Sequence, residues 1–243
     1  VVNASDRTII AHFLGTAANG IYSIANKFPN VFINFYNILN LSWTETVSLH
    51  FDDEDRDEFL TETMTSLFKL FAAACFGIVA CMPFVFPILI NEKYVAGYDQ
   101  ILILMYAMLF RVLVGLYSCI YVAQKNAKKI AYTSISAAII NITVNLILIN
   151  KIKIFAASIS TLVAFFSMFI IRYIDVNKTV HMRIRKPIII GSILIGTMLM
   201  GTYYCENKMI QLIALCITAI YAVLTNVDML KSGMKLVKSH LGK

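Results

Sequence analysis

Apolar stretches long enough to cross a lipid bilayer recur along nearly the whole chain, and they restrict its fold more than any other sequence feature. About 20 helical residues cross a hydrocarbon layer about 30 Å thick, and the stretches here reach or exceed that length. Hydrophobic residues make up 59% of the 243 residues, and the mean hydropathy is +0.74. Soluble domains are only about half apolar, so this excess indicates that lipid surrounds the chain.

Lipid offers the backbone no hydrogen-bond partners, so each spanning segment must be a helix or a strand of a closed barrel. Barrel strands are shorter and alternate in polarity, and these stretches do not. We therefore predict an all-α transmembrane bundle of about seven spans without a separate soluble domain. The predicted spans, within residues 19–227, are 19–49, 61–90, 99–123, 130–149, 154–174, 187–204 and 208–227.

The two ends of the chain differ from this pattern. Residues 1–15 are interpreted as the end of a preceding helix that Gly15 terminates, and residues 228–243 as a basic cytoplasmic tail. Because the first residue is Val1 and the pattern is already under way there, we expect a fragment whose N-terminal part is missing. The first two spans exceed the ordinary length, and their predicted kink sites are Pro29, Pro83 and Pro87.

Basic residues in the connecting segments predict the orientation of the bundle. Lysine and arginine gather in residues 124–129, 175–186 and the C-terminal tail, which lie on one side if the spans alternate. The opposite side carries only Arg7, Lys93, Lys151, Lys153 and Lys208. The more basic side is normally cytoplasmic, so we expect a multi-pass protein of the bacterial cytoplasmic membrane with a cytoplasmic C-terminus. Membrane orientation also explains the net charge of +7 without a nucleic-acid partner.

Arg111 is the charged residue placed deepest in a predicted span, near the middle of 99–123. A charge at that depth costs roughly 3 kcal/mol even on lenient scales, so it faces either a water-filled lumen or an internal ion-pair partner. Ala107, Gly115 and Ser118 share its helical face, and small residues suit both a lumen wall and close helix packing. We favour the lumen and keep the structural ion pair as the alternative.

A polar stripe follows the first predicted span. Its members recur at helical spacing and are Ser23, Asn26, Asn30, Asn34 and Asn37, with Lys27 at the edge. A lipid-facing helix would not carry such a stripe, so we interpret it as one wall of a hydrated cavity. Hydrogen bonds between amides of neighbouring helices are the alternative.

Other polar residues have simpler interpretations. Lys69 and Arg172 lie near predicted cytoplasmic ends, where long side chains snorkel to the headgroups. Trp43 is expected to be an interfacial anchor, with stacking against a substrate as the alternative. A face expected to pack against another helix consists of Ser134, Ala138, Asn141 and Asn145.

No catalytic, metal-binding or nucleotide-binding motif occurs around the four histidines, and the five cysteines form no C-x-x-C pair. We therefore predict a protein that is not an enzyme and holds neither a metal nor a cofactor. Any uphill transport would have to use an ion gradient, the membrane potential or consumption of the product.

The segment from Ser5 to Trp43 resembles the region that joins the two halves of polysaccharide flippases, of the O-antigen, teichoic acid or capsule type. These proteins belong to the multidrug/oligosaccharidyl-lipid/polysaccharide exporter superfamily. The residues that carry the resemblance are Ser5-Asp6-Arg7, Phe13-Leu14-Gly15, Gly20-Ile21-Tyr22-Ser23, Ala25, Lys27, Pro29 and Asn40 to Trp43. The rest of the chain is similar only in its pattern of spans.

The resemblance implies two helical lobes that alternate access to a central cationic cavity, with this chain as the C-terminal lobe beside an N-terminal lobe of the same transporter. The cargo would be an oligosaccharide linked to undecaprenyl diphosphate, which such flippases turn from the inner to the outer leaflet for cell-surface polysaccharide synthesis. Lys27 and Arg111 would neutralise the diphosphate, and the asparagines would contact phosphate or sugar hydroxyls.

Glu45 stands where the sequence departs from the family pattern around Trp43, and it is a candidate to pair with a basic group or a coupling ion. The main alternative function is a cation-coupled multidrug antiporter of the same superfamily. Cationic drugs need acidic walls, whereas the charges within the predicted spans are mainly Lys and Arg. A glycan polymerase would need a large outer loop, and a structural membrane subunit without transport activity is a third class.

Overall fold

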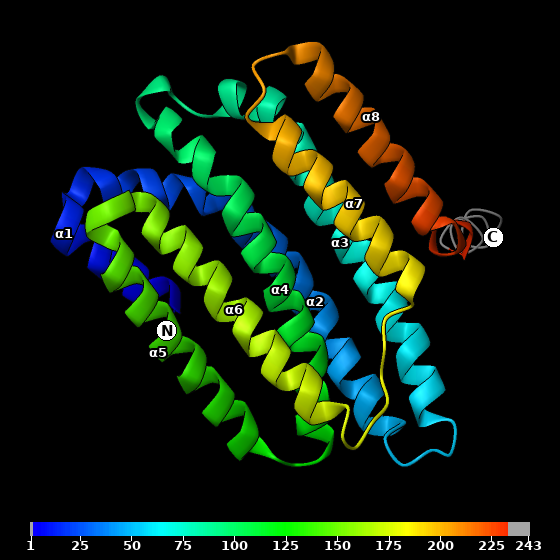
Figure 1. The fold of residues 1–243 in the computed structure, drawn as a ribbon. Helices are drawn as coiled ribbons and strands as arrows, with labels where there is room; N and C mark the ends of the chain where they lie inside the picture. The colour runs from blue at the N-terminus through cyan, green and yellow to red at the C-terminus, as the bar shows by residue number, and fades with distance from the viewer. Residues whose placement is uncertain (1, 233–243) are drawn as a thin grey trace, which may run out of the picture.

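Figure 1 shows a computed structural model of the chain, which describes residues 2–232. Within this range the chain forms helices and no strand, as the sequence predicts. The elements are α1 (Val2–Ala25), α2 (Lys27–Leu49), α3 (Arg56–Leu89), the 3-10 helix η1 (Glu92–Gly97), α4 (Tyr98–Ala123), α5 (Ala127–Ile152), α6 (Ile154–Val176), α7 (Lys186–Tyr203) and α8 (Lys208–Thr225). Most of the predicted basic tail, residues 233–243, lies outside the described residues.

Six helices of the described chain are long and apolar enough to cross a membrane: α3, α4 with η1, α5, α6, α7 and α8. They coincide with six of the predicted spans, so the prediction of an all-α, multi-pass membrane bundle is confirmed.

Residues 19–49 are predicted as one long span with a kink site at Pro29, and the structure divides this segment into two helices. The helix is interrupted at Asn26, between the end of α1 and the start of α2. Pro29 explains the break, because it has no N–H to donate to the carbonyl of Ala25 four residues earlier. α2 is also not among the six apolar helices, since its sequence is rich in amide side chains.

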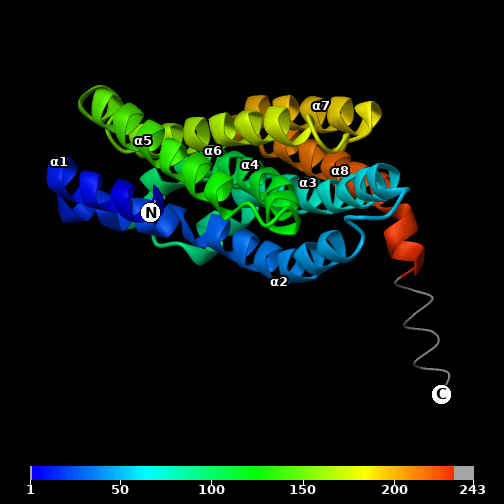
Figure 2. The same ribbon diagram turned by 90° about the horizontal axis from the view of Figure 1, so that it is seen from below.

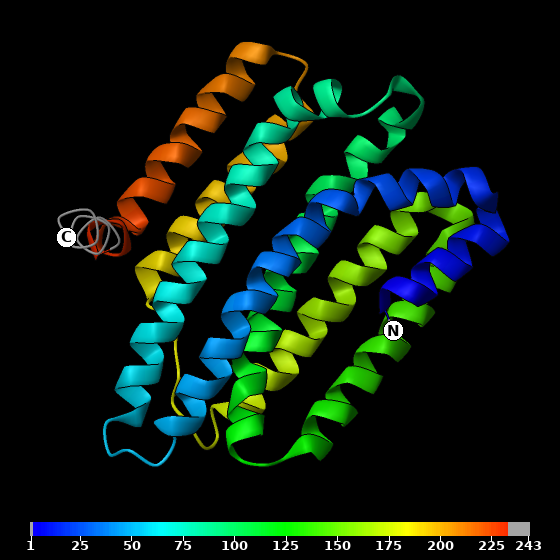
Figure 3. The ribbon, with the colours of Figure 1, turned by 180° about the vertical axis from the view of Figure 1, so that it is seen from behind.

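Gly15 divides α1 into two arms. Its φ of 84° lies in the left-handed region, which glycine adopts without steric cost. The predicted helix end at Gly15 is therefore confirmed, although a second arm follows directly. The first arm lies beside α5, and the second arm turns across the bundle toward η1 and leads into α2 (Figure 3).

Pro83 and Pro87 lie inside α3, which continues to Leu89. Pro87 cannot donate to the carbonyl oxygen of Pro83, so that buried acceptor loses its helical partner. Lys208 supplies a replacement, because its Nζ donates to this oxygen at 3.0 Å from the start of α8. The pairing satisfies the backbone and fastens α8 to α3.

α4 occupies the centre of the bundle between α2 and α6, with α5 on the far side of α6 (Figures 1 and 2). This position explains why α4 is the most completely buried of the six apolar helices. α2 comes close to α4 at Gly115, where a Cβ would lie 1.8 Å from Tyr36 Oη. Glycine is therefore required for this contact.

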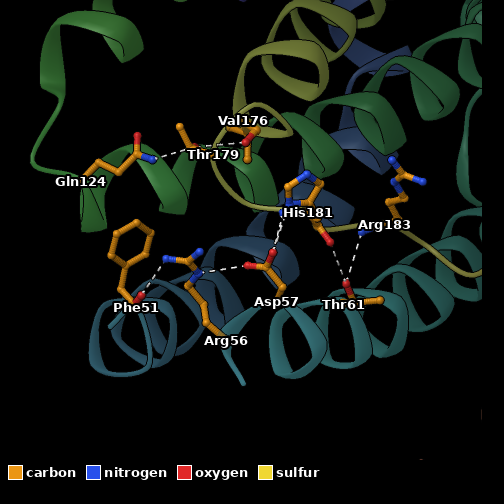
Figure 4. Close-up of polar contacts among 9 residues, drawn as sticks. All are labelled: Phe51, Arg56, Asp57, Thr61, Gln124, Val176, Thr179, His181 and Arg183. Carbon is orange, nitrogen blue, oxygen red and sulfur yellow. Dashed lines mark hydrogen bonds and ion pairs between the residues drawn. The ribbon is translucent and has the colours of Figure 1, made fainter. Parts of the chain in front are cut away.

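The connection between α6 and α7 crosses one end of the bundle as an extended segment. Side chains alternate along it, with Val180, Met182 and Ile184 buried and His181, Arg183 and Arg185 exposed. The backbone N–H of His181 donates to Asp57 Oδ2 at 3.0 Å, and that of Arg183 donates to Thr61 Oγ1 at 3.3 Å (Figure 4). These bonds hold the segment against the first turns of α3.

The α2–α3, α4–α5 and α6–α7 connections lie at the same end of the bundle (Figure 1). Gln124 Nε2 donates to Thr179 Oγ1 at 3.0 Å, and Arg185 Nη2 pairs with Glu62 Oε1 at 2.7 Å. The basic segments 124–129 and 175–186 therefore meet at one end, as alternating spans predict.

We expect Gly115→Ala to lower the free energy of unfolding by about 1–3 kcal/mol, because the added methyl displaces Tyr36 and its hydrogen bond to Asn40. Gly77→Ala is the matched control, since a Cβ there meets nothing within 4 Å. Alanine favours a helix over glycine by up to about 1 kcal/mol, so the control is neutral or stabilised. Thermal unfolding in one detergent measures both variants, and equal melting temperatures would contradict the close contact.

Candidate functional site

Arg111 lies in the middle of α4 and is half-buried. Its Cζ lies 5.8 Å from the centroid of the Phe165 ring of α6. Among the described residues, no carboxylate lies within ion-pairing distance of this guanidinium. The described residues therefore do not form the internal ion pair that was the alternative. The positive charge of Arg111 has no counter-ion among them.

The small residues on the Arg111 face have a packing role at one position. Ala107 is buried and Ser118 is partly exposed, whereas Gly115 receives the ring of Tyr36 from α2. Close packing of α2 and α4 thus lies next to the arginine. The close-packing interpretation of this face is therefore confirmed at Gly115, and the lumen-wall interpretation stays a prediction.

The stripe on α2 divides into an exposed and a buried part. Lys27, Asn30, Asn34 and Asn37 are exposed, while the opposite face of α2 packs against the bundle through buried residues such as Phe32. α2 itself lies on the side of the bundle that Figure 3 turns toward the reader. No described side-chain hydrogen bond joins these three amides to another helix, so the alternative of amide bonding between helices finds no support there.

Asn26 does not belong to the exposed stripe. It is 4% exposed, and its Nδ2 donates to the carbonyl of Tyr22 at 2.8 Å. The side chain therefore binds the last turn of α1, where the chain changes direction into α2. Its role in the described structure is to hold this junction.

Glu45 and Trp43 lie near the far end of α2 and have different surroundings. Glu45 is exposed, with no cation within ion-pairing distance among the described residues. The prediction of an interfacial anchor at Trp43 is wrong, because the side chain is 3% exposed and its Nε1 donates to the carbonyl of Leu116 at 3.2 Å. The sequence does not show how α2 is rotated about its axis. In the structure this rotation points the indole toward α4.

The expectation that Arg172 snorkels to the headgroups is also wrong, because this arginine is 2% exposed. Its Nε and Nη2 donate to Thr133 Oγ1 at 3.1 and 2.9 Å, and its Nη1 donates to the carbonyl of Val114 at 3.1 Å. Its Cζ lies 5.9 Å from the centroid of the Tyr121 ring. All these partners are neutral, so a second positive charge lies within the bundle between α4, α5 and α6.

Asp6 is a buried carboxylate, and in the sequence it is noted only within the resemblance to polysaccharide flippases. Asp6, in the first arm of α1, is 0% exposed. Asp6 Oδ2 accepts from Thr161 Oγ1 at 2.6 Å and from Tyr22 Oη at 3.2 Å, and Asp6 Oδ1 accepts from Asn145 Nδ2 at 2.8 Å. Every described partner is a neutral donor, so no cation balances the carboxylate.

The polar groups around Asp6 extend across three helices. Ser5 Oγ donates to Asn141 Oδ1 at 3.1 Å, and Asn141 Nδ2 donates to Ser160 Oγ at 3.1 Å. Asn145 Oδ1 is buried and has no hydrogen-bond partner among the described residues. An unpaired buried oxygen beside an uncompensated carboxylate is the oxygen-rich setting that a proton or a hard cation favours.

Two features of the sequence could have pointed to this cluster. One is a lone acid in an apolar segment, and the other is the pair of amides at i, i+4 in the span 130–149. The prediction that Asn141 and Asn145 lie on a packing face is confirmed, since both are 0% exposed. Ser134 of the same predicted face is exposed, although its hydroxyl still accepts from Arg172 Nη2 at 3.4 Å.

No family model, curated protein or solved structure matches the chain in comparisons of sequence and fold. The similarity of residues 5–43 to polysaccharide flippases therefore stays a prediction, and the function is argued from the side chains.

We expect Thr133→Val to lower the free energy of unfolding by about 1.5–3 kcal/mol, because the isosteric change removes the acceptor of two charged donors of Arg172. Thr197→Val is the matched control, since this hydroxyl is exposed and bonds only within its own helix. The control should change stability by less than about 0.5 kcal/mol. Denaturation in detergent measures both, and equal effects would contradict the proposed dependence of Arg172 on Thr133.

Proposed function

We propose that this chain is one lobe of a flippase that moves a lipid-linked, anionic oligosaccharide across the bacterial cytoplasmic membrane for cell-surface polysaccharide synthesis. The observation that carries the proposal is the uncompensated, half-buried Arg111 in the central helix. An intramembrane charge without a counter-ion is expensive unless water or an anionic cargo reaches it. A diphosphate-linked glycan is such a cargo.

The exposed face of α2 supports a cavity shared with a second lobe. Lys27, Asn30, Asn34 and Asn37 project from the bundle on a helix that packs against α4, the helix that carries Arg111. Lipid would leave these polar groups without partners, whereas a hydrated cleft between two lobes would satisfy them. In the proposal, Lys27 and Arg111 neutralise phosphate, and the amides bond to phosphate or sugar hydroxyls.

Asp6 is the second element of the proposal and would couple transport to a cation. Its carboxylate is sealed between α1, α5 and α6 with neutral donors only, beside the unpaired oxygen of Asn145. Binding of H⁺ or Na⁺ there would change the net charge at the contact of these three helices. Glu45, which is exposed on α2, is the rival candidate for this role.

The antiporter alternative has one observation in its favour, which is the presence of an intramembrane acid at Asp6. That carboxylate is 0% exposed and is enclosed by its hydrogen bonds, whereas Lys27 and Arg111 are the more accessible charges. Accessible cations repel a cationic drug and attract an anionic headgroup. The accessible charges therefore favour the flippase.

The proposed orientation places the end with the α4–α5 and α6–α7 connections in the cytoplasm. Basic segments 124–129 and 175–186 meet there, and positively charged connections are retained on the cytoplasmic side. The glycan would enter the cavity from this end and leave at the other.

In vesicles with the full-length protein and a fluorescent lipid-linked oligosaccharide, we expect Arg111→Ala and Lys27→Ala to slow flipping about tenfold or more. This factor corresponds to the loss of a charge-assisted hydrogen bond of roughly 1.5–3 kcal/mol. Arg111→Lys should keep part of the rate, because it retains the charge but loses the planar fork.

Lys93→Ala is the control for this experiment, since it removes an exposed lysine of η1 that the proposal does not place in the cavity. Wild-type flipping in both alanine variants would contradict the assignment of the cavity. Efflux of a cationic drug by the wild type, with no glycan flipping, would instead support the antiporter.

We expect Asp6→Asn to abolish the acceleration of flipping by an imposed proton or sodium gradient, because the neutral amide takes up no proton and offers a cation no negative charge. Slow flipping without a gradient should persist. Glu45→Gln is the comparison variant and should keep the gradient response. The opposite pattern, with Glu45→Gln insensitive and Asp6→Asn responsive, would transfer the coupling role to Glu45.

A further inference from the structure

A groove of about 660 Å³ opens on the surface between the end of α6 and the beginning of α5. Its wall has a cationic part, with Lys128, Lys129 and Lys178, and an apolar part, with Tyr132, Ile171 and Ile174. Neither the predicted cavity nor the Asp6 cluster includes these residues. Residues of α4, α5 and α6 line the groove, and no residue of α2 is among them, so the groove is separate from the polar face of α2.

The cationic part carries more positive than negative charge. Lys129 Nζ pairs with Asp175 Oδ2 at 2.6 Å, whereas no carboxylate of the described chain lies within ion-pairing distance of Lys128 or Lys178. Thr133, also in the groove wall, accepts from the buried Arg172 behind it. The first turn of α5 adds the positive end of a helix dipole. An anion is the ligand that this arrangement attracts.

The apolar part indicates what kind of anion fits. Tyr132 is 75% exposed, Ile171 40% and Ile174 55%, on helices that are apolar enough to cross the membrane. Their exposed surface therefore faces hydrocarbon, while the lysines lie at the ends of the same helices, at headgroup depth. A small soluble anion would contact only the lysines, but a phospholipid has both an anionic headgroup and acyl chains.

We infer that this groove binds an anionic membrane phospholipid, with its phosphate between Lys128 and Lys178 and an acyl chain along Ile171 and Ile174. The bound lipid neutralises the lysines that Asp175 does not. It also covers the outer surface of α5 and α6 beside the buried Arg172. The site is independent of the flippase proposal, because it requires only that the helices lie in a bilayer.

The test uses the 243-residue chain in nanodiscs made of equal amounts of phosphatidylglycerol and phosphatidylcholine. Native mass spectrometry counts the lipids that stay bound after release from the disc. We expect phosphatidylglycerol to be retained in preference to phosphatidylcholine. Lys128→Gln with Lys178→Gln should reduce that preference about fivefold for each lysine removed, the factor given by about 1 kcal/mol per basic residue at a lipid surface.

The matched control is Lys93→Gln with Lys231→Gln, which removes the same charge from exposed positions outside the groove. Equal loss of preference in both double variants, or no preference in the wild type, would overturn the site.

A second variant separates a lipid from a free anion. Ile171→Ser with Ile174→Ser leaves every lysine in place and should still weaken retention of phosphatidylglycerol, because it removes the surface for the acyl chain. Unchanged retention in this variant, together with displacement of the lipid by inorganic phosphate, would show a site for small anions and overturn the assignment to phospholipid.

Discussion

The structure depends on one constraint, which is that lipid cannot supply hydrogen bonds to polar groups inside the bundle. A group that neither finds a partner in the protein nor reaches water carries a cost in free energy. Lys208 donates to the carbonyl that Pro87 leaves free, and the indole of Trp43 donates to the backbone of α4. Arg172 is held in the same way by Thr133 and by the carbonyl of Val114. These contacts also determine which helices are neighbours, because each joins two different helices.

This constraint divides the polar residues into two groups with different meanings. Arg172 and Asp6 are enclosed, and neutral partners satisfy them within the described chain. Arg111 and the amides of α2 are more accessible and have no such set of partners. The first group fixes the packing of α5 and α6 against α1 and α4. In the proposed function, a hydrated cavity with an anionic cargo supplies partners to the second group.

The arrangement of helices links these groups. α4 packs against α2 on one side and α6 on the other, so it lies between the exposed polar face and the enclosed charges. α5 carries Thr133 beside Arg172 and Asn145 beside Asp6, at two depths of one helix. Asp6 lies at the contact of α1, α5 and α6, and Arg172 lies at the contact of α4, α5 and α6, so the two sites share α5 and α6.

The sequence by itself determined that this is an all-α membrane bundle, where six of its spans lie and that Gly15 ends a helix, because hydropathy and backbone geometry are local properties. It also found Arg111 and the polar face of α2. Only the tertiary structure decided that Trp43 and Arg172 point inward and that Asp6 meets Asn145 and Thr161. The rotation of a helix about its axis depends on its neighbours. Residues that are far apart in the chain become partners only when those neighbours are in place.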